Sequence, residues 1–184
     1  MKSIDKYLFQ ALDNYPYSLE ETVESLDYAL SYDDKNTIAL CLYGRLYSEQ
    51  LHRYEVAKEY FQQAIGIDIH ALEVYVHYIQ ALILNEDFAE AEKLIDFALT
   101  VKGINKAEIL LKRVLLLESQ RKFEDALEAI SEVKVTTFSN DTSYETENAE
   151  KRLKEKIDLL KDKKKGKDKK EKSKKSEKEK KKKQ

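Results

Sequence analysis

The sequence predicts an all-α fold in which similar helix pairs are stacked one after another, and three observations support this prediction. An apolar pattern with the spacing of an α-helix occurs four times, at intervals of 34 or 35 residues. Glycine occurs four times and proline once among 184 residues, which leaves few of the turns that a many-stranded sheet needs. The hydrophobic content of 42% is sufficient for a core of ordinary size.

The recurring pattern is a set of four residues that step along the chain by 3, 4 and 3 positions. This spacing places all four on one face of a helix with about 3.6 residues per turn. Mostly small residues at the second and fourth places allow a neighbouring helix to approach, and larger ones at the first and third places fill the space between helices. The sets are Leu19, Thr22, Leu26, Ala29; Tyr54, Ala57, Phe61, Ala64; Phe88, Ala91, Ile95, Ala98; and Phe123, Ala126, Ile130, Val133.

Residues 40–64 carry the fullest version of this pattern, because both helices of the pair can be recognised there. The pattern residues are Leu40, Tyr43, Gly44 and Tyr47, then Tyr54, Ala57, Phe61 and Ala64, with one extra residue between the two halves. This segment resembles the tetratricopeptide repeat, a helix pair of about 34 residues with the pattern W-x2-L-G-x2-Y, then A-x3-F and a proline. The closing proline is absent from all four repeats of this chain.

The resemblance implies a right-handed superhelix of antiparallel helix pairs, with repeats at about residues 3–36, 37–71, 72–106 and 107–138. In such repeats the first helices form the inner, concave wall, and partner peptides bind there. The wall positions implied for this chain are Cys41, Arg45 and Ser48 in the second repeat; Glu73, Val76, His77, Gln80 and Ile83 in the third; and Glu108, Leu111, Lys112 and Leu115 in the fourth.

Local signals agree with this order of helices. Pro16 lies between the two helices of the first repeat, and Ser18-x-x-Glu21 is a capping box that predicts a helix start directly after Ser18. A second capping box, Thr142-x-x-Glu145, precedes an apolar stripe of Ala149, Leu153, Ile157 and Leu160. We expect residues 142–160 to form a capping helix, because the last apolar face of a solenoid has to be covered.

The net charge of −2 combines two oppositely charged parts. Residues 161–184 contain 15 lysines and five acids, so residues 1–160 carry a net charge of −12. The lysine-rich tail contains no apolar side chain and is predicted to be disordered. Its lysines are candidates for binding RNA, ribosomes or another polyanion, and the alternative is a solubilising tail that contacts the acidic body. The candidate lysines are Lys163, Lys164, Lys165, Lys169, Lys170, Lys174, Lys175, Lys180, Lys181, Lys182 and Lys183.

The charges on the implied wall indicate which partner it favours. Tetratricopeptide proteins that bind acidic chaperone peptides use a clamp of Lys, Asn and Arg side chains. Here Glu73 and Glu108 occupy places where bases are needed, so we expect a basic or apolar partner segment. The sequence therefore predicts a non-enzymatic interaction module or scaffold that holds a partner protein on its concave face. The alternative is an adaptor that binds RNA, ribosomes or another polyanion through its tail.

Catalytic and metal-binding patterns are absent from the sequence. There is no Gly-rich phosphate loop and no Ser/His/Asp or Cys/His arrangement, so we expect no enzymatic activity and no cofactor. His70, Glu73 and His77 have helical spacing, but no fourth ligand accompanies them, so we expect no metal site. Cys41 is interpreted as a packing residue, and most of the twelve tyrosines as packing residues rather than base-stacking ones.

The sequence also predicts where the protein is found. No secretory signal is evident at the amino terminus, and no apolar stretch reaches the roughly 18 residues that cross a bilayer. The single cysteine cannot form an internal disulfide. These features predict a soluble, cytoplasmic protein.

Overall fold

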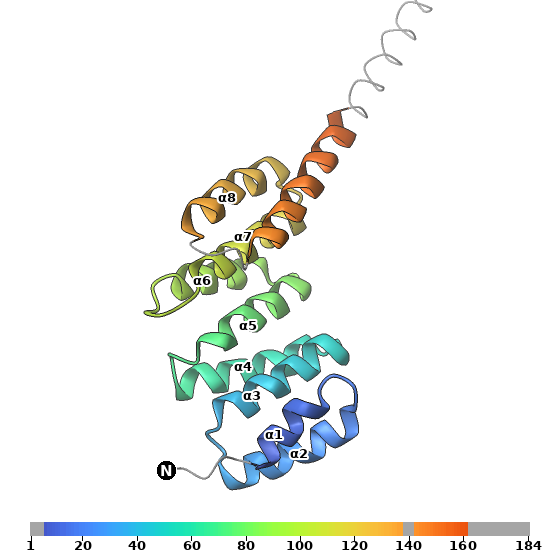
Figure 1. The fold of residues 1–184 in the computed structure, drawn as a ribbon, viewed down its shortest axis with the longest axis vertical. Coiled ribbons are helices and arrows are strands. Elements are labelled where there is room, and N and C mark those ends of the chain that lie inside the picture. The colour runs from blue at the N-terminus through green and yellow to red at the C-terminus, as the bar shows by residue number, and fades with distance from the viewer. Residues whose placement is uncertain (1–5, 138–141, 162–184) are drawn as a thin grey trace, which may run out of the picture.

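The structure is a computed structural model of the chain, and it describes residues 6–137 and 142–161. Within these ranges the regular secondary structure is helical throughout, and the helices form antiparallel pairs stacked along one axis (Figure 1). The predicted all-α solenoid is therefore confirmed. The first helices of the pairs are α1 (Lys6–Asn14), α3 (Thr37–Arg45), α5 (Leu72–Leu84) and α7 (Lys106–Ser119). The second helices are α2 (Leu19–Tyr32), α4 (Tyr54–Ile67), α6 (Phe88–Ala98) and α8 (Phe123–Thr136).

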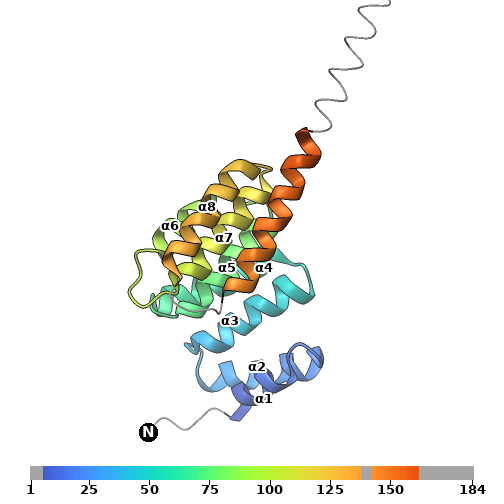
Figure 2. The same ribbon diagram turned by 45° about the horizontal axis from the view of Figure 1, so that its top comes forward.

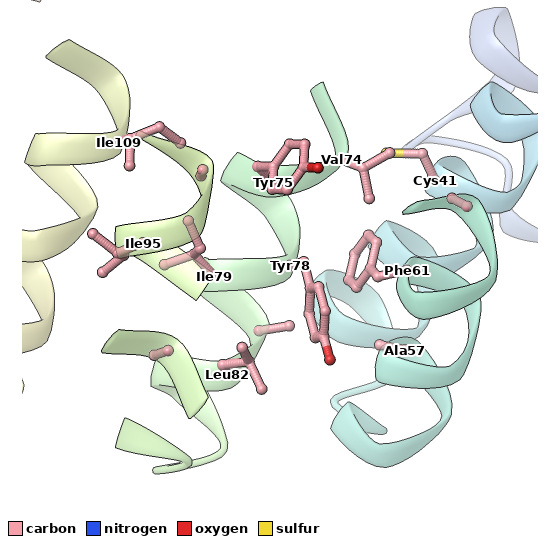
Figure 3. Close-up of a cluster of buried hydrophobic side chains, with 14 of the residues drawn as sticks. Cys41, Ala57, Phe61, Val74, Tyr75, Tyr78, Ile79, Leu82, Ile95 and Ile109 are labelled. Carbon is pink, nitrogen blue, oxygen red and sulfur yellow. The ribbon is translucent and has the colours of Figure 1, made fainter. Parts of the chain in front are cut away.

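The recurring apolar sets form the interior of the stack. The third residue of each set is buried, and so are the small residues on either side of it. Phe61 of α4, for example, lies against Tyr78 of α5 with the ring centroids 5.6 Å apart (Figure 3). Ala57 lies one turn before Phe61 on the same face of α4, so that α5 can approach. The 3-4-3 spacing therefore identified the packing face of each second helix correctly.

Gly44 permits the close approach of α3 to α4. A Cβ atom at this position would lie 2.5 Å from a ring carbon of Phe61, well inside van der Waals contact. Glycine is therefore needed here for space, since any side chain would push the Phe61 ring away.

The turns inside the helix pairs repeat as regularly as the helices. His52, Glu86 and Arg121 have positive φ angles of 52°, 62° and 61°, and they follow one another at intervals of 34 and 35 residues. In the third pair the amide of Asp87 then donates to the carbonyl of Leu82 at 2.9 Å. A left-handed residue followed by this backward hydrogen bond is a common way to satisfy the last carbonyls of a helix. The amide of Lys122 donates to the carbonyl of Leu117 in the same way, so the third and fourth pairs share this turn.

The second pair departs from the others in its first helix. There α3 continues into a π-helical segment, η1 (Leu46–Gln50). A π turn takes up one residue more than an α turn, and this pair is the one with an extra residue between its halves. The amide of Arg53 accordingly donates to the carbonyl of Tyr47, six positions back instead of five. The insertion is thus absorbed without disturbing the stack.

The first helices form the inner layer of the solenoid. α3 packs on α5 and α5 packs on α7, whereas no contact of similar extent joins α2 to α4, α4 to α6 or α6 to α8 in the described part of the chain. When one layer of a stack is more closely spaced than the other, that layer lies on the inside of the curve. The concave side is therefore lined by α1, α3, α5 and α7 (Figures 1 and 2).

Residues 143–161 form one more helix after α8, shown in orange in Figure 1. We refer to it as the terminal helix. Ala149, Leu153 and Ile157 bury their side chains in a cluster with residues of α7 and α8. Leu160, expected in the same stripe, is exposed because this end of the helix extends beyond α7 and α8. Among the described residues, no helix combines the length and the apolar character required to cross a membrane.

Candidate functional site

A pocket of about 450 Å³ opens between α5, α7 and the terminal helix. It lies on the concave side because α5 and α7 belong to the inner layer. Five of the predicted wall residues line it: Val76, Glu108, Leu111, Lys112 and Leu115. The terminal helix contributes Glu145, Asn148, Ala149 and Arg152, and Val114 completes the lining.

The lining of this pocket combines apolar, acidic and basic groups. Val76, Leu111 and Leu115 are half-buried, so they present part of their apolar surface to the pocket. Glu108 of α7 and Glu145 of the terminal helix are both exposed. The pocket therefore offers an apolar surface beside two solvated carboxylates, and it suits a side chain that has an aliphatic stem and a cationic end.

Lys112 is the cation that lies deepest in this part of the groove. Its ammonium group donates a hydrogen bond to Oε1 of Gln80 on α5, at 2.9 Å. Burial lowers the pKa of Lys112, and the negative charges of Glu145 and Glu108 act in the opposite direction. The effect of burial is the larger of the two, so the pKa of Lys112 lies below its ordinary value.

A second polar cluster occupies the groove closer to the amino terminus, and Glu49 of η1 is its centre. The carboxylate of Glu49 accepts hydrogen bonds from the Tyr15 hydroxyl and from Nε of Arg45, the latter at 3.3 Å. Nδ1 of His77 lies 3.3 Å from the same carboxylate. The Arg45 guanidinium also lies 4.8 Å from the centroid of the Tyr15 ring. Three successive helix pairs thus meet at one carboxylate.

These contacts determine the charges in the cluster. Burial raises the pKa of Glu49, but hydrogen bonds with His77 and Tyr15 and the charge of Arg45 outweigh it and hold the pKa at about 2. Burial, together with the hydrogen bond to Glu49, raises the pKa of Tyr15 to about 12. Glu49 is therefore ionised and Tyr15 neutral at physiological pH. As a result, the positive charge of Arg45 is already paired inside the protein.

Three of the residues assigned to the wall are buried instead. Ser48 is 3% and Ile83 4% exposed, and the thiol of Cys41 lies in the core beside Val74 (Figure 3). Ser48 lies within the π turn, which changes the direction of the side chains there and brings Glu49 to the surface instead. Ile83 packs in the central core with the residues of α5 that face the neighbouring helices. The prediction that these residues are accessible on the wall is corrected accordingly.

The remaining predicted residues lie outside the pocket and outside the polar cluster around Glu49. Glu73 is exposed in the first turn of α5 and does not line the pocket. His70 is exposed in the turn before α5, and the described ranges contain no group of His, Cys, Asp or Glu side chains arranged to hold a metal ion. The candidate tail lysines, from Lys163 to Lys183, lie outside the described residues.

Several residues of the site were not found from the sequence. Glu49 had one signal, the extra residue in the second repeat, because an insertion changes which side chains face the groove. No sequence signal pointed to Glu145, Asn148 and Arg152, since they lie after the last repeat and no periodic pattern includes them.

Comparison with known proteins adds no relative to this description: no protein-family model matches the chain, and no curated protein was found to match it. The functional proposal is therefore based on the helix packing and on the groove.

Proposed function

We propose that this chain is a tetratricopeptide-type interaction module that holds a segment of a partner protein on its concave side and has no catalytic role. The helix-pair period, the Gly44–Phe61 contact and the inner layer of first helices support the family assignment. A continuous inner surface formed by successive first helices is the part of such solenoids that holds peptides. A cytoplasmic location belongs to the same proposal.

The observation that carries this proposal is the pocket between α5, α7 and the terminal helix. Leu111 and Leu115 provide apolar contact area, and Glu108 and Glu145 provide exposed carboxylates. A lysine or arginine of the partner would place its methylene groups against the leucines and its charge near the carboxylates. The partner segment is therefore expected to be basic.

Charge pairing inside the groove favours the same partner. Arg45 is paired with Glu49, Arg152 is paired with Glu118, and the ammonium group of Lys112 donates to Gln80. Each of these cations therefore has a partner inside the protein, whereas the side chains of Glu108 and Glu145 are exposed. With residues 1–160 at a net charge of −12, the long-range field also attracts basic segments.

A charge-reversal experiment tests this function. The partner is first identified by affinity purification of the full chain and then produced as a purified segment. Glu108→Lys with Glu145→Lys is expected to weaken its binding at least tenfold, since two attractive charges become repulsive. The control is Glu128→Lys with Glu132→Lys, which makes the same charge change at exposed positions of α8. Equal affinity of the groove variant and the control would refute the proposed site.

The second candidate function is polyanion binding by the tail, and the observation that favours it is the concentration of 15 lysines in residues 161–184. Deleting residues 162–184 separates the two functions. If the tail binds RNA, the deletion removes RNA retention and leaves binding of the protein partner intact. If the groove is the main site and the tail binds no RNA, the deletion leaves RNA retention unchanged, and the charge-reversed groove releases the protein partner.

A further inference from the structure

The two ends of the solenoid differ in what they expose. At the carboxy-terminal end the terminal helix covers α7 and α8 and presents mostly charged residues outward. At the amino-terminal end, α1 and α2 form the last layer that the structure describes (Figure 1). The terminal repeats of a solenoid normally have a polar outer face. Here the end pair exposes, beside its polar residues, several large apolar and aromatic side chains: Phe9, Leu12, Tyr17, Tyr28 and Tyr32.

Three tyrosines of this pair are organised into a stack. Tyr7 of α1 lies against Tyr28 of α2 with centroids 5.0 Å apart, and against Tyr32 with centroids 5.8 Å apart. The Tyr7 and Tyr32 rings are nearly parallel, at 9°. Tyr28 and Tyr32 are 47% and 76% exposed, so large parts of their surfaces face solvent. We call Tyr7, Tyr28 and Tyr32 the tyrosine face.

Two residues of the tyrosine face, Tyr28 and Tyr32, lie on a strongly acidic helix, α2. α2 contains four acidic side chains and no basic one, and Asp33 and Asp34 follow directly after it. Glu24 precedes Tyr28 by four residues, and Tyr28 precedes Tyr32 by four, so all three lie along one side of α2. Aromatic rings and carboxylates are therefore presented together. Each attracts cations, the ring through its face and the carboxylate through its charge.

We propose that the tyrosine face and the adjacent carboxylates of α2 form a second docking surface, which binds a basic protein segment through arginine or lysine side chains. Arginine suits this surface best, because its planar guanidinium can stack on a tyrosine ring and donate hydrogen bonds to a carboxylate at the same time. Nucleic acid does not fit, since its phosphates would be repelled by the acidic side chains of α2. The surface is separate from the groove pocket, which is lined by α5, α7 and the terminal helix. Of these, α7 and the terminal helix lie far from α1 and α2 along the stack (Figure 2).

Two designed peptides serve as probes for this surface. Both have the same apolar residues, one has arginine and the other glutamate at every charged position, and each carries a fluorophore. Binding is measured by fluorescence anisotropy with the full chain carrying Glu108→Lys and Glu145→Lys, so that the groove pocket does not contribute. The arginine peptide is expected to bind, with an affinity that falls as salt is added, and the glutamate peptide is not.

Substitutions of the exposed rings then locate the site. Tyr28→Ala with Tyr32→Ala is expected to weaken binding of the arginine peptide by about tenfold, since two cation–π contacts are lost. Tyr28→Phe with Tyr32→Phe keeps both rings and is expected to retain the affinity. Tyr144→Ala is the matched control, because Tyr144 is also 76% exposed and lies on the terminal helix.

Three results would overturn the proposal. The first is an unchanged affinity for the arginine peptide when both rings are removed. The second is a concentration-dependent dimer in sedimentation that the same two alanine substitutions abolish, which would make a second copy of the chain the occupant. The third is a tighter peptide affinity after deletion of residues 162–184, which would make the chain's own lysine-rich segment the occupant. The arginine peptide can also bind as expected while the variant with Glu108→Lys and Glu145→Lys binds the groove partner with unchanged affinity. In that case only the groove proposal fails.

Discussion

Glu118 and Arg152 form a bidentate ion pair between α7 and the terminal helix. Nε of Arg152 donates to Oε1 of Glu118 at 2.8 Å, and Nη2 donates to Oε2 at 2.7 Å. Lys156 adds a third hydrogen bond to the same carboxylate, at 2.6 Å. The Glu118 side chain is only 6% exposed, so this pair is shielded from solvent on one side. It fixes the helix that completes the groove pocket, and Arg152 also lines that pocket.

The first prediction concerns this ion pair. Glu118→Gln removes the charge that holds Arg152 and Lys156, and it is expected to lower the free energy of unfolding by about 2 kcal/mol. Arg152→Lys is expected to cost less, because lysine keeps the charge but loses the two-pronged geometry. Urea unfolding followed by circular dichroism measures both changes. Glu128→Gln, at an exposed position of α8, is the control, and an equal loss there would contradict the assignment.

The second prediction is the pH dependence of the same contact. Hydrogen bonds from Arg152 oppose the effect of burial and, together with Lys156, lower the pKa of Glu118 to about 2 from an ordinary value of 4.5. Between these two pH values the unfolded chain binds more protons than the native one, so stability falls as the pH is lowered. The stability difference between wild type and Glu118→Gln is expected to be complete above pH 4.5 and to disappear as the pH approaches 2. A difference that stays constant over this range would show that the charge of Glu118 is not responsible.

The third prediction uses two glycines. Gly44→Ala places a Cβ atom 2.5 Å from the Phe61 ring and is expected to destabilise the protein by about 1–3 kcal/mol, even though alanine favours a helix. Gly66→Ala, also in a helix, meets no atom within 4 Å and is expected to stabilise the protein by about 0.5–1 kcal/mol. Thermal unfolding compares the two variants. The steric argument fails if both changes have the same sign.

The fourth prediction concerns the repeated turn. Glu86 has a φ of 62°, which is strained for a residue with a side chain. Glu86→Gly is expected to raise the free energy of unfolding by about 0.5–1 kcal/mol. The same substitution at Glu59, an exposed position inside α4, is expected to lower it by about 1 kcal/mol. Denaturant midpoints of the two variants should therefore move in opposite directions.

The fifth prediction concerns the reactivity of the single cysteine. Cys41 is buried, and burial together with the nearby charge of Glu73 raises the pKa of its thiol to about 12. Because the thiolate is the reactive form, the native protein is expected to react with a thiol reagent at least a hundredfold more slowly than the urea-unfolded chain. A native rate close to the unfolded one would mean that Cys41 is accessible on the groove wall.

Much of the fold could be predicted from the sequence because its signals are local. The helix predicted to follow Ser18 starts at Leu19, although the Ser18 side chain makes no capping hydrogen bond to the backbone, and the 3-4-3 sets predicted which faces of the second helices are buried. The candidate site was predicted less completely. Five wall residues line the pocket, but Cys41, Ser48 and Ile83 are buried, and Glu49 lies in the groove where Ser48 was expected. The spacing of the repeats does not show at which point of a helix an inserted residue is accommodated as a π turn.

The helix pairs, their period and their packing faces follow from the amino-acid sequence, since these features depend on the spacing of side chains within one or two turns of a helix. Which polar groups meet depends on the three-dimensional packing of the helix pairs. Glu49 lies near Tyr15 and His77, and Glu118 near Arg152, because stacking brings together residues that are 28 to 34 positions apart. Those distances depend on how successive pairs are placed on one another, and no short-range pattern encodes that placement.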